Sequence, residues 1–128
     1  MDINVTIQQA RQLVAVMHLQ GDIDASNFVQ VVDKAREIYQ NPANNLIIDL
    51  SEVPSISSTG LVAIHKIALL YSGVPEKEAH PDLTHSSNAR KHVKLLSPQP
   101  AVDKALETAG LKLFFKVFHD LESALNSF

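Results

Sequence analysis

A short apolar run near the middle of the chain constrains the fold most. Residues Leu46 to Leu50 read Leu-Ile-Ile-Asp-Leu, and turn-forming residues stand on both sides of them. A continuous run of this kind is typical of a strand that is covered on both faces in a largely parallel sheet. Helices are therefore expected to pack on that sheet, which predicts an α/β fold.

Hydrophobic spacing divides the rest of the chain into strands and helices. Alternation around Val5 and from Leu13 to Leu19 predicts an opening hairpin, and Ser26 stands where a helix N-cap is expected. The other expected elements are helices over 28–38, 61–71 and about 102–109, strands over 93–96 and from Phe114 to Phe118, and a final helix capped by Asp120. This order, ββαβαβαβα, predicts one domain over residues 1–128, with a mixed sheet of about five strands and about four helices.

Residues 72–92 differ in composition from everything around them. They are rich in Gly, Pro, Ser, Glu and Lys and offer almost nothing to bury, which predicts a long polar surface loop. Three histidines and two glutamates in it could suggest a metal site, but their spacing fits no helical or finger pattern of zinc ligands. No metal site is expected from these residues, which are Glu76, Glu78, His80, His85 and His92.

Composition excludes several classes of function. The chain has no cysteine, which excludes disulfides and thiolate sites, and its net charge of −3 with scattered Lys and Arg disfavours nucleic-acid binding. No apolar stretch approaches the length of a membrane span, and the N-terminus lacks the pattern of a secretory signal. The glycines are isolated, so no phosphate-binding loop is expected. We expect a cytoplasmic protein that is not an enzyme and binds no cofactor.

Three consecutive hydroxyl residues stand where the central strand has ended and a helix is about to begin. They are Ser57, Ser58 and Thr59, followed by Gly60. The plain interpretation is helix capping, which stabilises a helix by about 1 kcal/mol. One cap needs only one hydroxyl, however, and a phosphate at a helix N-terminus is stabilised by the amide groups and the helix dipole. Ser58 is therefore a chemically reasonable phospho-acceptor.

The helix after these hydroxyls carries more apolar surface than one core contact consumes. On a helical wheel, Val62 and Leu69 lie between the directions of His65 and Lys66, away from the face expected to cover the sheet. This stripe suggests a protein-binding face, unless the loop over 72–92 folds back and covers it. The core face is predicted to consist of Ala63, Ile64, Ile67, Ala68 and Tyr71.

The same segment resembles a known family signature. Asp-Leu-Ser-x-Val-x-x-Ile over 49–56, followed by Ser-Ser-Thr-Gly-Leu over 57–61, is similar to the signature of STAS domains, the anti-sigma-factor antagonists. The resemblance extends through Gly21–Asp24, Ser97-Pro98 and Thr108–Leu111 to the last strand and helix. It implies a small sheet covered on one face by helices.

The resemblance also implies a partner and a switch. Many STAS domains bind an anti-sigma factor that is also a serine kinase; phosphorylation releases it, and a PP2C-type phosphatase restores binding. Carried over by position, the acceptor is Ser58, with Ser57 and Thr59 less favoured, and Asp24 lies near the partner surface. The docking helix would present Gly60, Val62, His65, Lys66 and Leu69.

One position departs from the family pattern. Family members commonly carry Asp immediately before the acceptor, where this chain has Ser57. This favours, as an alternative, a constitutive STAS interaction or scaffold module, such as a subunit of a stressosome-like assembly or of a lipid-transport complex. A second alternative is a small-ligand sensor that binds an anion or nucleotide at the hydroxyl cluster.

Overall fold

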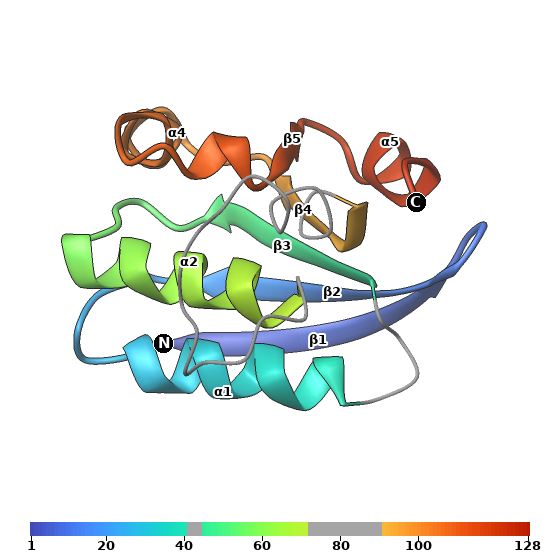
Figure 1. The fold of residues 1–128 in the computed structure, drawn as a ribbon, viewed down its shortest axis with the longest axis horizontal. Helices are drawn as coiled ribbons and strands as arrows, with labels where there is room; N and C mark the ends of the chain where they lie inside the picture. Colours follow the sequence, from blue (N-terminus) through green and yellow to red (C-terminus); the bar gives the residue numbers. More distant parts are fainter. Residues whose placement is uncertain (41–44, 72–90) are drawn as a thin grey trace.

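The centre of the fold is a five-stranded mixed sheet. The structure is a computed structural model that describes residues 1–40, 45–71 and 91–128 (Figure 1). The strands lie side by side in sequence order, with the first antiparallel to the second and every later neighbour parallel. They are β1 (Asp2–Gln9), β2 (Leu13–Gln20), β3 (Asn45–Glu52), β4 (Val93–Leu96) and β5 (Lys116–Phe118). The predicted α/β fold and mixed sheet are confirmed.

Within the part of the chain that the structure describes, four α-helices and one short 3-10 helix connect and cover the strands. The helices are α1 (Phe28–Tyr39), α2 (Ser58–Tyr71), α4 (Pro100–Thr108) and α5 (Leu121–Asn126), and the 3-10 helix is η2 (Leu111–Leu113). Parallel neighbouring strands need a crossover connection, because the chain must return to the end of the sheet where the previous strand began. The crossover helices α1 and α2 pack against each other on one face of the sheet. The element order predicted from hydrophobic spacing is confirmed.

Alternate positions along the strands supply two separate cores. On the inner face, Ala15 and Met17 of β2 belong to one buried cluster that includes side chains of α1, α2 and α4. On the outer face, Val14, Val16 and Ile47 form a second cluster with Ala124 of α5. The continuous apolar run of β3 is therefore divided between two cores, which explains why it shows no alternation.

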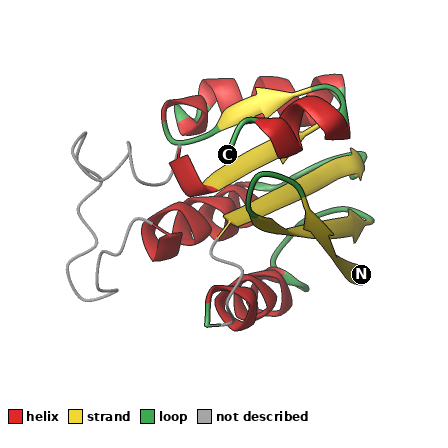
Figure 2. Ribbon diagram, turned by 90° about the vertical axis from the view of Figure 1, so that its right-hand side faces the viewer, coloured by secondary structure: helices red, strands yellow, loops and turns green. Residues whose placement is uncertain are grey.

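The helices cover both faces of the sheet, as the apolar run of β3 predicts, so the single covered face implied by the family resemblance is wrong. Figure 2 shows helices on both sides of the strands. The outer face is covered by α5, whose N-cap is Asp120; the Asp120 carboxylate accepts a hydrogen bond of 2.8 Å from the Ser123 amide, as predicted. Phe118, Leu121 and Leu125 extend the apolar contact beneath this helix.

Two local predictions are also corrected. Helix α1 is preceded by Asn27 rather than capped by Ser26, because Ser26 donates its amide and hydroxyl to Asp24 instead. The last strand begins at Lys116 rather than Phe114, because Leu111–Leu113 form a helical turn and Phe115 enters the inner core at 1% exposure. The predicted loop over 72–92 lies outside the described residues except for Lys91 and His92, which are helical.

Candidate partner-binding site

The carboxyl ends of β2 and β3 bring the predicted site together. After these strands, Ile23 and Ile56 form an isolated parallel bridge. The Ile23 amide donates to the Ser55 carbonyl at 3.2 Å, and the Ser57 amide donates to the Ile23 carbonyl at 2.9 Å. The connection that contains Asp24 is thereby held beside the N-terminus of α2, as the predicted site requires.

Gly60 allows the first turn of α2 to lie against this connection. A Cβ atom at Gly60 would collide with the carbonyl oxygen of Ile23 and would approach Cγ1 of Ile56 to 2.7 Å. The glycine of the signature is therefore needed for close packing between two backbone segments. Gly60 itself is buried, so its part in the site is to position its neighbours.

Asp24 is held in a turn by its own neighbours. Its carboxylate accepts hydrogen bonds from the Ser26 hydroxyl at 2.5 Å and the Ser26 amide at 2.9 Å. These bonds lower the pKa of Asp24 below its ordinary value, so the side chain is an anion at neutral pH. Asn27 fixes the same turn, since its amide oxygen accepts from the Asp24 amide at 3.0 Å and its amide nitrogen donates to the Asp22 carbonyl at 2.7 Å. Asp24 thus adds a fixed negative charge beside α2.

The three hydroxyls of the cluster have different environments. Ser57 Oγ accepts the Gly60 amide at 3.1 Å, and the Ser57 carbonyl accepts the Leu61 amide, so Ser57 caps α2. Ser58 is the first residue of the helix and its side chain is exposed, whereas Thr59 is partly buried. Among the described residues, the Ser58 hydroxyl has no hydrogen-bond partner. Capping thus accounts for the Ser57 hydroxyl, whereas the Ser58 hydroxyl is exposed and is not needed for the cap.

The exposed face of α2 is narrower than the sequence indicates. Val62 is 48% exposed, and Lys66 lies exposed beside it with its ammonium 5.3 Å from the centre of the Phe28 ring. Leu69 is only 8% exposed, so it does not extend an exposed apolar stripe from Val62; of the two alternatives, an exposed stripe and a covered one, Leu69 fits the covered one. The wheel places Leu69 by direction alone, and its burial depends on neighbours that a wheel omits.

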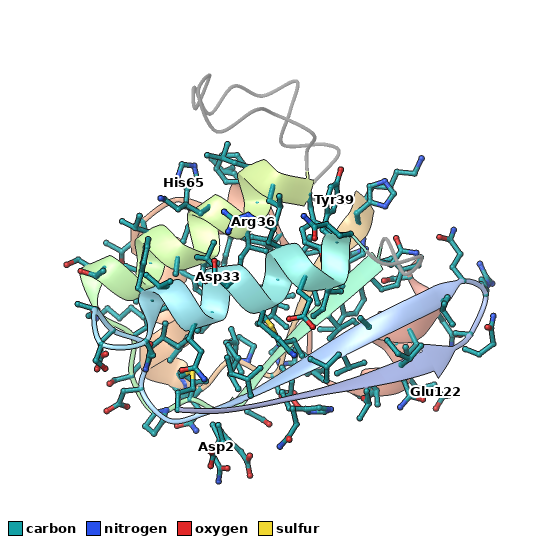
Figure 3. All side chains as sticks on the ribbon, turned by 90° about the horizontal axis from the view of Figure 1, so that it is seen from below. Asp2, Asp33, Arg36, Tyr39, His65 and Glu122 are labelled. Carbon is teal, nitrogen blue, oxygen red and sulfur yellow. The ribbon has the colours of Figure 1, made fainter. Side chains whose placement is uncertain are left out.

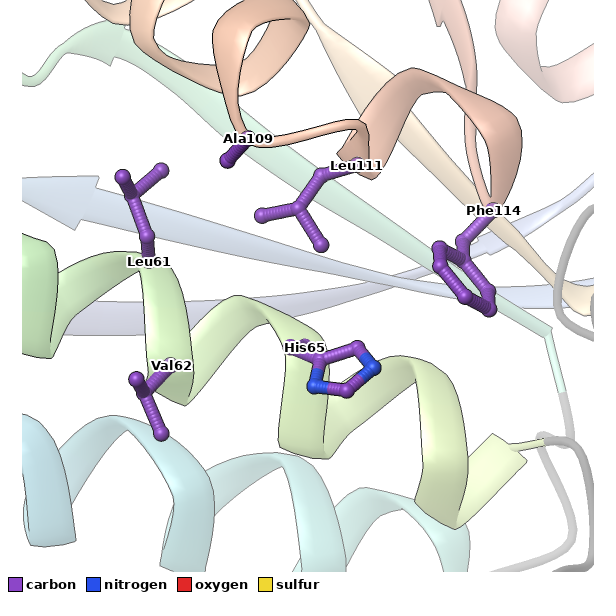
Figure 4. A pocket seen from close by; sticks show the side chains of 6 residues that line it. All are labelled: Leu61, Val62, His65, Ala109, Leu111 and Phe114. Atoms are coloured by element: carbon purple, nitrogen blue, oxygen red, sulfur yellow. The ribbon is translucent and has the colours of Figure 1, made fainter. Parts of the chain in front are cut away.

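A groove runs along the other side of Val62. It has a volume of about 310 Å³, with Leu61, Val62 and His65 of α2 on one wall (Figure 4). The His65 and Phe114 rings meet edge to face with centroids 5.4 Å apart, and burial lowers the pKa of His65. The residues that line the groove are mostly apolar. The opposite wall consists of Ala109, Leu111 and Phe114.

Sequence reasoning missed this opposite wall. Leu111 lies within the segment that carried the family resemblance, and it is 4% exposed. The signal that could have revealed the wall is the Gly110 turn, which has a φ of 75° and starts the 3-10 helix. A left-handed glycine after α4 reverses the chain towards α2.

The aspartate of the signature has a structural position on the outer sheet face. Asp49 Oδ2 lies 2.7 Å from Nδ1 of His18, and Oδ1 accepts the Ser51 amide at 3.0 Å. The second ring nitrogen of His18 lies 3.5 Å from the Thr6 hydroxyl. Asp49 thus fixes the end of β3 just before the connection to Ser57. It lies on the sheet, outside the groove.

Comparisons with known proteins give the family. The STAS domain family model matches residues 4–72, which is more than half of the chain. The chain belongs to the STAS domain family. A search of curated proteins finds no significant match.

Solved structures with the same fold include anti-sigma factor antagonists. One from Mycobacterium paratuberculosis superposes with a TM-score of 0.69 at 20% identity, covering 98% of this chain and 93% of that one. The antagonist SpoIIAA in its unphosphorylated form gives a TM-score of 0.61 at 17% identity, with 94% and 93% covered. The phosphorylated form of the Bacillus cell fate determinant SpoIIAA gives 0.58 at 15% identity, with 96% and 97% covered. At these identities the likeness shows the fold.

The structure brings some of the predicted site residues together and leaves others apart. The described residues contain no group of three or more His, Asp or Glu side chains placed to hold a metal ion. No described helix is long and apolar enough to cross a bilayer. The structure brings Asp24, Ser57 and Ser58 to one end of the sheet, next to the groove beside Val62 and His65. It leaves Leu69 in the buried half of the helix.

Proposed function

We propose that this STAS domain is an anti-sigma-factor antagonist that acts by binding, and that phosphorylation of Ser58 controls the binding. In its unphosphorylated state it would hold an anti-sigma factor with serine kinase activity in the cytoplasm. A phosphate on Ser58 would release that partner, and a PP2C-type phosphatase would restore the complex. The observation that carries the proposal is an exposed hydroxyl on the first turn of α2, beside an apolar groove.

The local electrostatics support Ser58 over its neighbours. A phosphoserine at the first helical position meets free backbone amides and the positive end of the helix dipole, so the added charge of about −2 is tolerated by the domain. Ser57 is occupied as the cap, and Thr59 is partly buried. Phosphorylation would therefore change what the surface presents without unfolding α2, and the repulsion and desolvation cost would fall on the bound partner.

Ser57 in place of the family aspartate is compatible with this switch. Ser and Asp are comparable N-caps, and the Ser57 hydroxyl already accepts the Gly60 amide. An aspartate there would add a like charge directly before the phosphate, which Ser57 does not. The substitution keeps the cap and removes a repulsion, so it does not by itself argue for constitutive binding.

Affinity measurements with matched variants test the switch. Calorimetric titration would compare the unmodified protein, Ser58→Asp and Ser58→Asn against the anti-sigma factor kinase of the same organism. We expect Ser58→Asp to weaken binding by about 100-fold and the neutral, equally sized Ser58→Asn to retain affinity within about threefold. Equal affinity for Ser58→Asp and the unmodified protein would contradict the charge mechanism.

Phosphopeptide mapping provides the complementary test. After incubation with that kinase and ATP, we expect one phosphate, located on Ser58 and removable by a PP2C-type phosphatase. Binding without phosphate on Ser57, Ser58 or Thr59 would indicate the constitutive interaction or scaffold module instead. No binding, together with thermal stabilisation by nucleotide or inorganic phosphate, would indicate the small-ligand sensor.

A further inference from the structure

The strand β1 leaves one long edge of the sheet open. Within the described part of the chain it pairs only with β2, over the whole of Asp2–Gln9. Its outward N–H and C=O groups therefore have no strand partner there. Natural proteins usually protect such edges with lysine, proline, a bulge or a very short strand. The sequence Asp-Ile-Asn-Val-Thr-Ile-Gln-Gln has no lysine or proline and pairs in unbroken register over eight residues.

We infer that a second copy of this chain pairs with that edge, so that two β1 strands run antiparallel about a two-fold axis at Val5. In this register Val5 faces its own symmetry mate and Ile3 faces Ile7 of the partner subunit. On the other face of the sheet, Asn4 is opposite Thr6 of the partner subunit. Over residues 2–8, apolar side chains thus meet apolar ones and polar side chains meet polar ones, which is the complementarity that a two-fold interface requires.

Alternative registers are less complementary. A shift by one residue would place Val5 opposite a residue that points to the other face, because side chains alternate along a strand. A shift by two residues towards the C-terminus would place Ile3 opposite Gln9. A shift by two residues towards the N-terminus would pair Ile3 with Val5 but would place Ile7 opposite Met1, which lies outside β1. The axis at Val5 is therefore the one in which all three inner-face apolar residues of β1 face one another, and none of the three is fully buried in one chain.

The surroundings of the strand fit the same arrangement. Ile7 is 55% exposed, so its side chain is accessible to a strand that pairs with this edge. A groove of about 340 Å³ lies beside Ile3, between β1 and α1. Pairing about Val5 places Ile7 of the partner subunit opposite Ile3, at the mouth of this groove. The other lining residues are Gln30, Asp33, Lys34 and Glu37, whose aliphatic stems can cover it.

The two-fold interface would leave open the groove between α2 and η2, where the proposed function places the anti-sigma factor. Figure 3 shows β1 running along one side of the molecule next to α1, where Asp33 and Arg36 are labelled. The partner-binding groove lies between α2 and the segment around η2, and β1 and β5 are at opposite edges of the sheet. The inference is therefore independent of the proposed switch, and either can fail without the other.

Sedimentation equilibrium with matched lysine variants tests the pairing. We expect the unmodified protein to approach twice the 14.1 kDa mass of one chain as concentration rises. Ile7→Lys should be a monomer, because its charge would face the inner side of the joint sheet. The control is Leu113→Lys, which places the same charge on a 61% exposed leucine away from β1 and should leave the dimer intact. A monomeric unmodified protein at all accessible concentrations, or a dimeric Ile7→Lys, would overturn the inference.

A cysteine scan tests the register, because the natural sequence has no cysteine. Val5→Cys should form an intermolecular disulfide on mild oxidation, since directly opposed residues of antiparallel strands have Cα atoms about 4.5–5.5 Å apart, within disulfide range. Thr6→Cys is the control: diagonal neighbours are about 7–8 Å apart, so it should remain largely unlinked. Efficient linking of Thr6→Cys, or none of Val5→Cys, would overturn the register.

Discussion

The two halves of helix α2 differ in how much of their surface is exposed, although they belong to one continuous element. The first half, from Ser58 to Lys66, presents an exposed hydroxyl, a 48% exposed valine and one wall of the groove. The second half packs against α1 and the sheet: Ile67 is fully buried, and the Tyr71 hydroxyl donates to the Ala35 carbonyl at 3.2 Å. Both halves contribute to the buried face, since Ile64 of the first half is also fully buried, but only the N-terminal half adds an exposed hydroxyl and an exposed apolar side chain.

Under the proposed function, this division lets a small domain keep a binding surface without losing stability. A surface that exchanges partners has to keep apolar side chains partly in water, which contributes little to folding. The cost is offset when the same helix is fixed elsewhere by full burial. Here the buried Ile64 and Ile67 lie within three turns of Ser58, so the proposed switch position is held in place while Val62, one turn away, remains exposed.

Truncation of one aliphatic side chain in each half gives the sharpest test of this division. We expect Ile67→Ala to destabilise the domain by about 2–5 kcal/mol, because it opens a cavity in the inner core. Val62→Ala should change the free energy of unfolding by less than about 1 kcal/mol, since Val62 is half exposed. Urea unfolding measures both values.

Binding measurements on the same pair complete that test. If the groove binds the partner, Val62→Ala should weaken affinity for the anti-sigma factor by about 10-fold while leaving the fold intact. Equal destabilisation by the two substitutions would contradict the division of the helix into an anchor and a binding surface.

Gly60→Ala tests whether the exposed half also depends on close packing. An alanine Cβ would collide with the backbone of Ile23, and backbone cannot yield as a side-chain tip can. We expect a net destabilisation of about 1–3 kcal/mol, even though alanine favours a helix over glycine by about 1 kcal/mol. Thermal unfolding would measure it. A stability equal to that of the unmodified protein would show that the contact with the Asp24 connection relaxes easily.

The sequence predicted this site through local patterns. Three successive hydroxyls after a buried strand mark a helix N-terminus, and the structure assigns the cap to Ser57 and the exposed position to Ser58. The core face of α2 also follows from the 3.6-residue period, because Ile64, Ile67, Ala68 and Tyr71 are all in the inner core. Such features depend on residues close in sequence.

Features that depend on distant segments could not be predicted in the same way. A helical wheel gives the direction of Leu69 but not its burial, which depends on residues outside the helix. The groove wall formed by Leu111 and Phe114 depends on how the chain turns after α4. The division of β3 between two cores requires knowing that α5 returns to the outer face. These are long-range packing results, which local spacing does not encode.

Tyr71→Phe is expected to weaken the anchored half by about 1 kcal/mol, because it removes one buried hydrogen bond to Ala35. The buried Tyr71 hydroxyl also predicts that the free energy of unfolding falls in alkaline solution. Burial, and then the nearby Tyr39, raise the pKa of Tyr71 above its ordinary value of 10.0. The unfolded chain therefore loses this proton first, so stability is complete below about pH 10 and falls as pH rises beyond it. Urea unfolding at about pH 8 and about pH 11 would show this fall in the unmodified protein and a smaller one in Tyr71→Phe.

Substitution of His65 should produce the smallest change in the free energy of unfolding. It tests the pH dependence of stability in acid, as Tyr71 does in alkali, and it lies in the exposed half of α2. Partial burial in the groove lowers the pKa of His65 below its ordinary value of 6.5. As pH falls through 6.5 the unfolded chain binds this proton first, so stability is complete above that pH and declines towards the lower pKa of the folded protein. His65→Leu keeps an apolar contact with Phe114 but cannot titrate, and His92, whose pKa is also lowered, remains in both proteins. We therefore expect a slightly steeper loss of unfolding free energy between about pH 7 and pH 5 in the unmodified protein than in His65→Leu. Parallel curves would mean that the groove does not desolvate the imidazole, and that the exposed half of α2 is more open to water than its contact with Phe114 indicates.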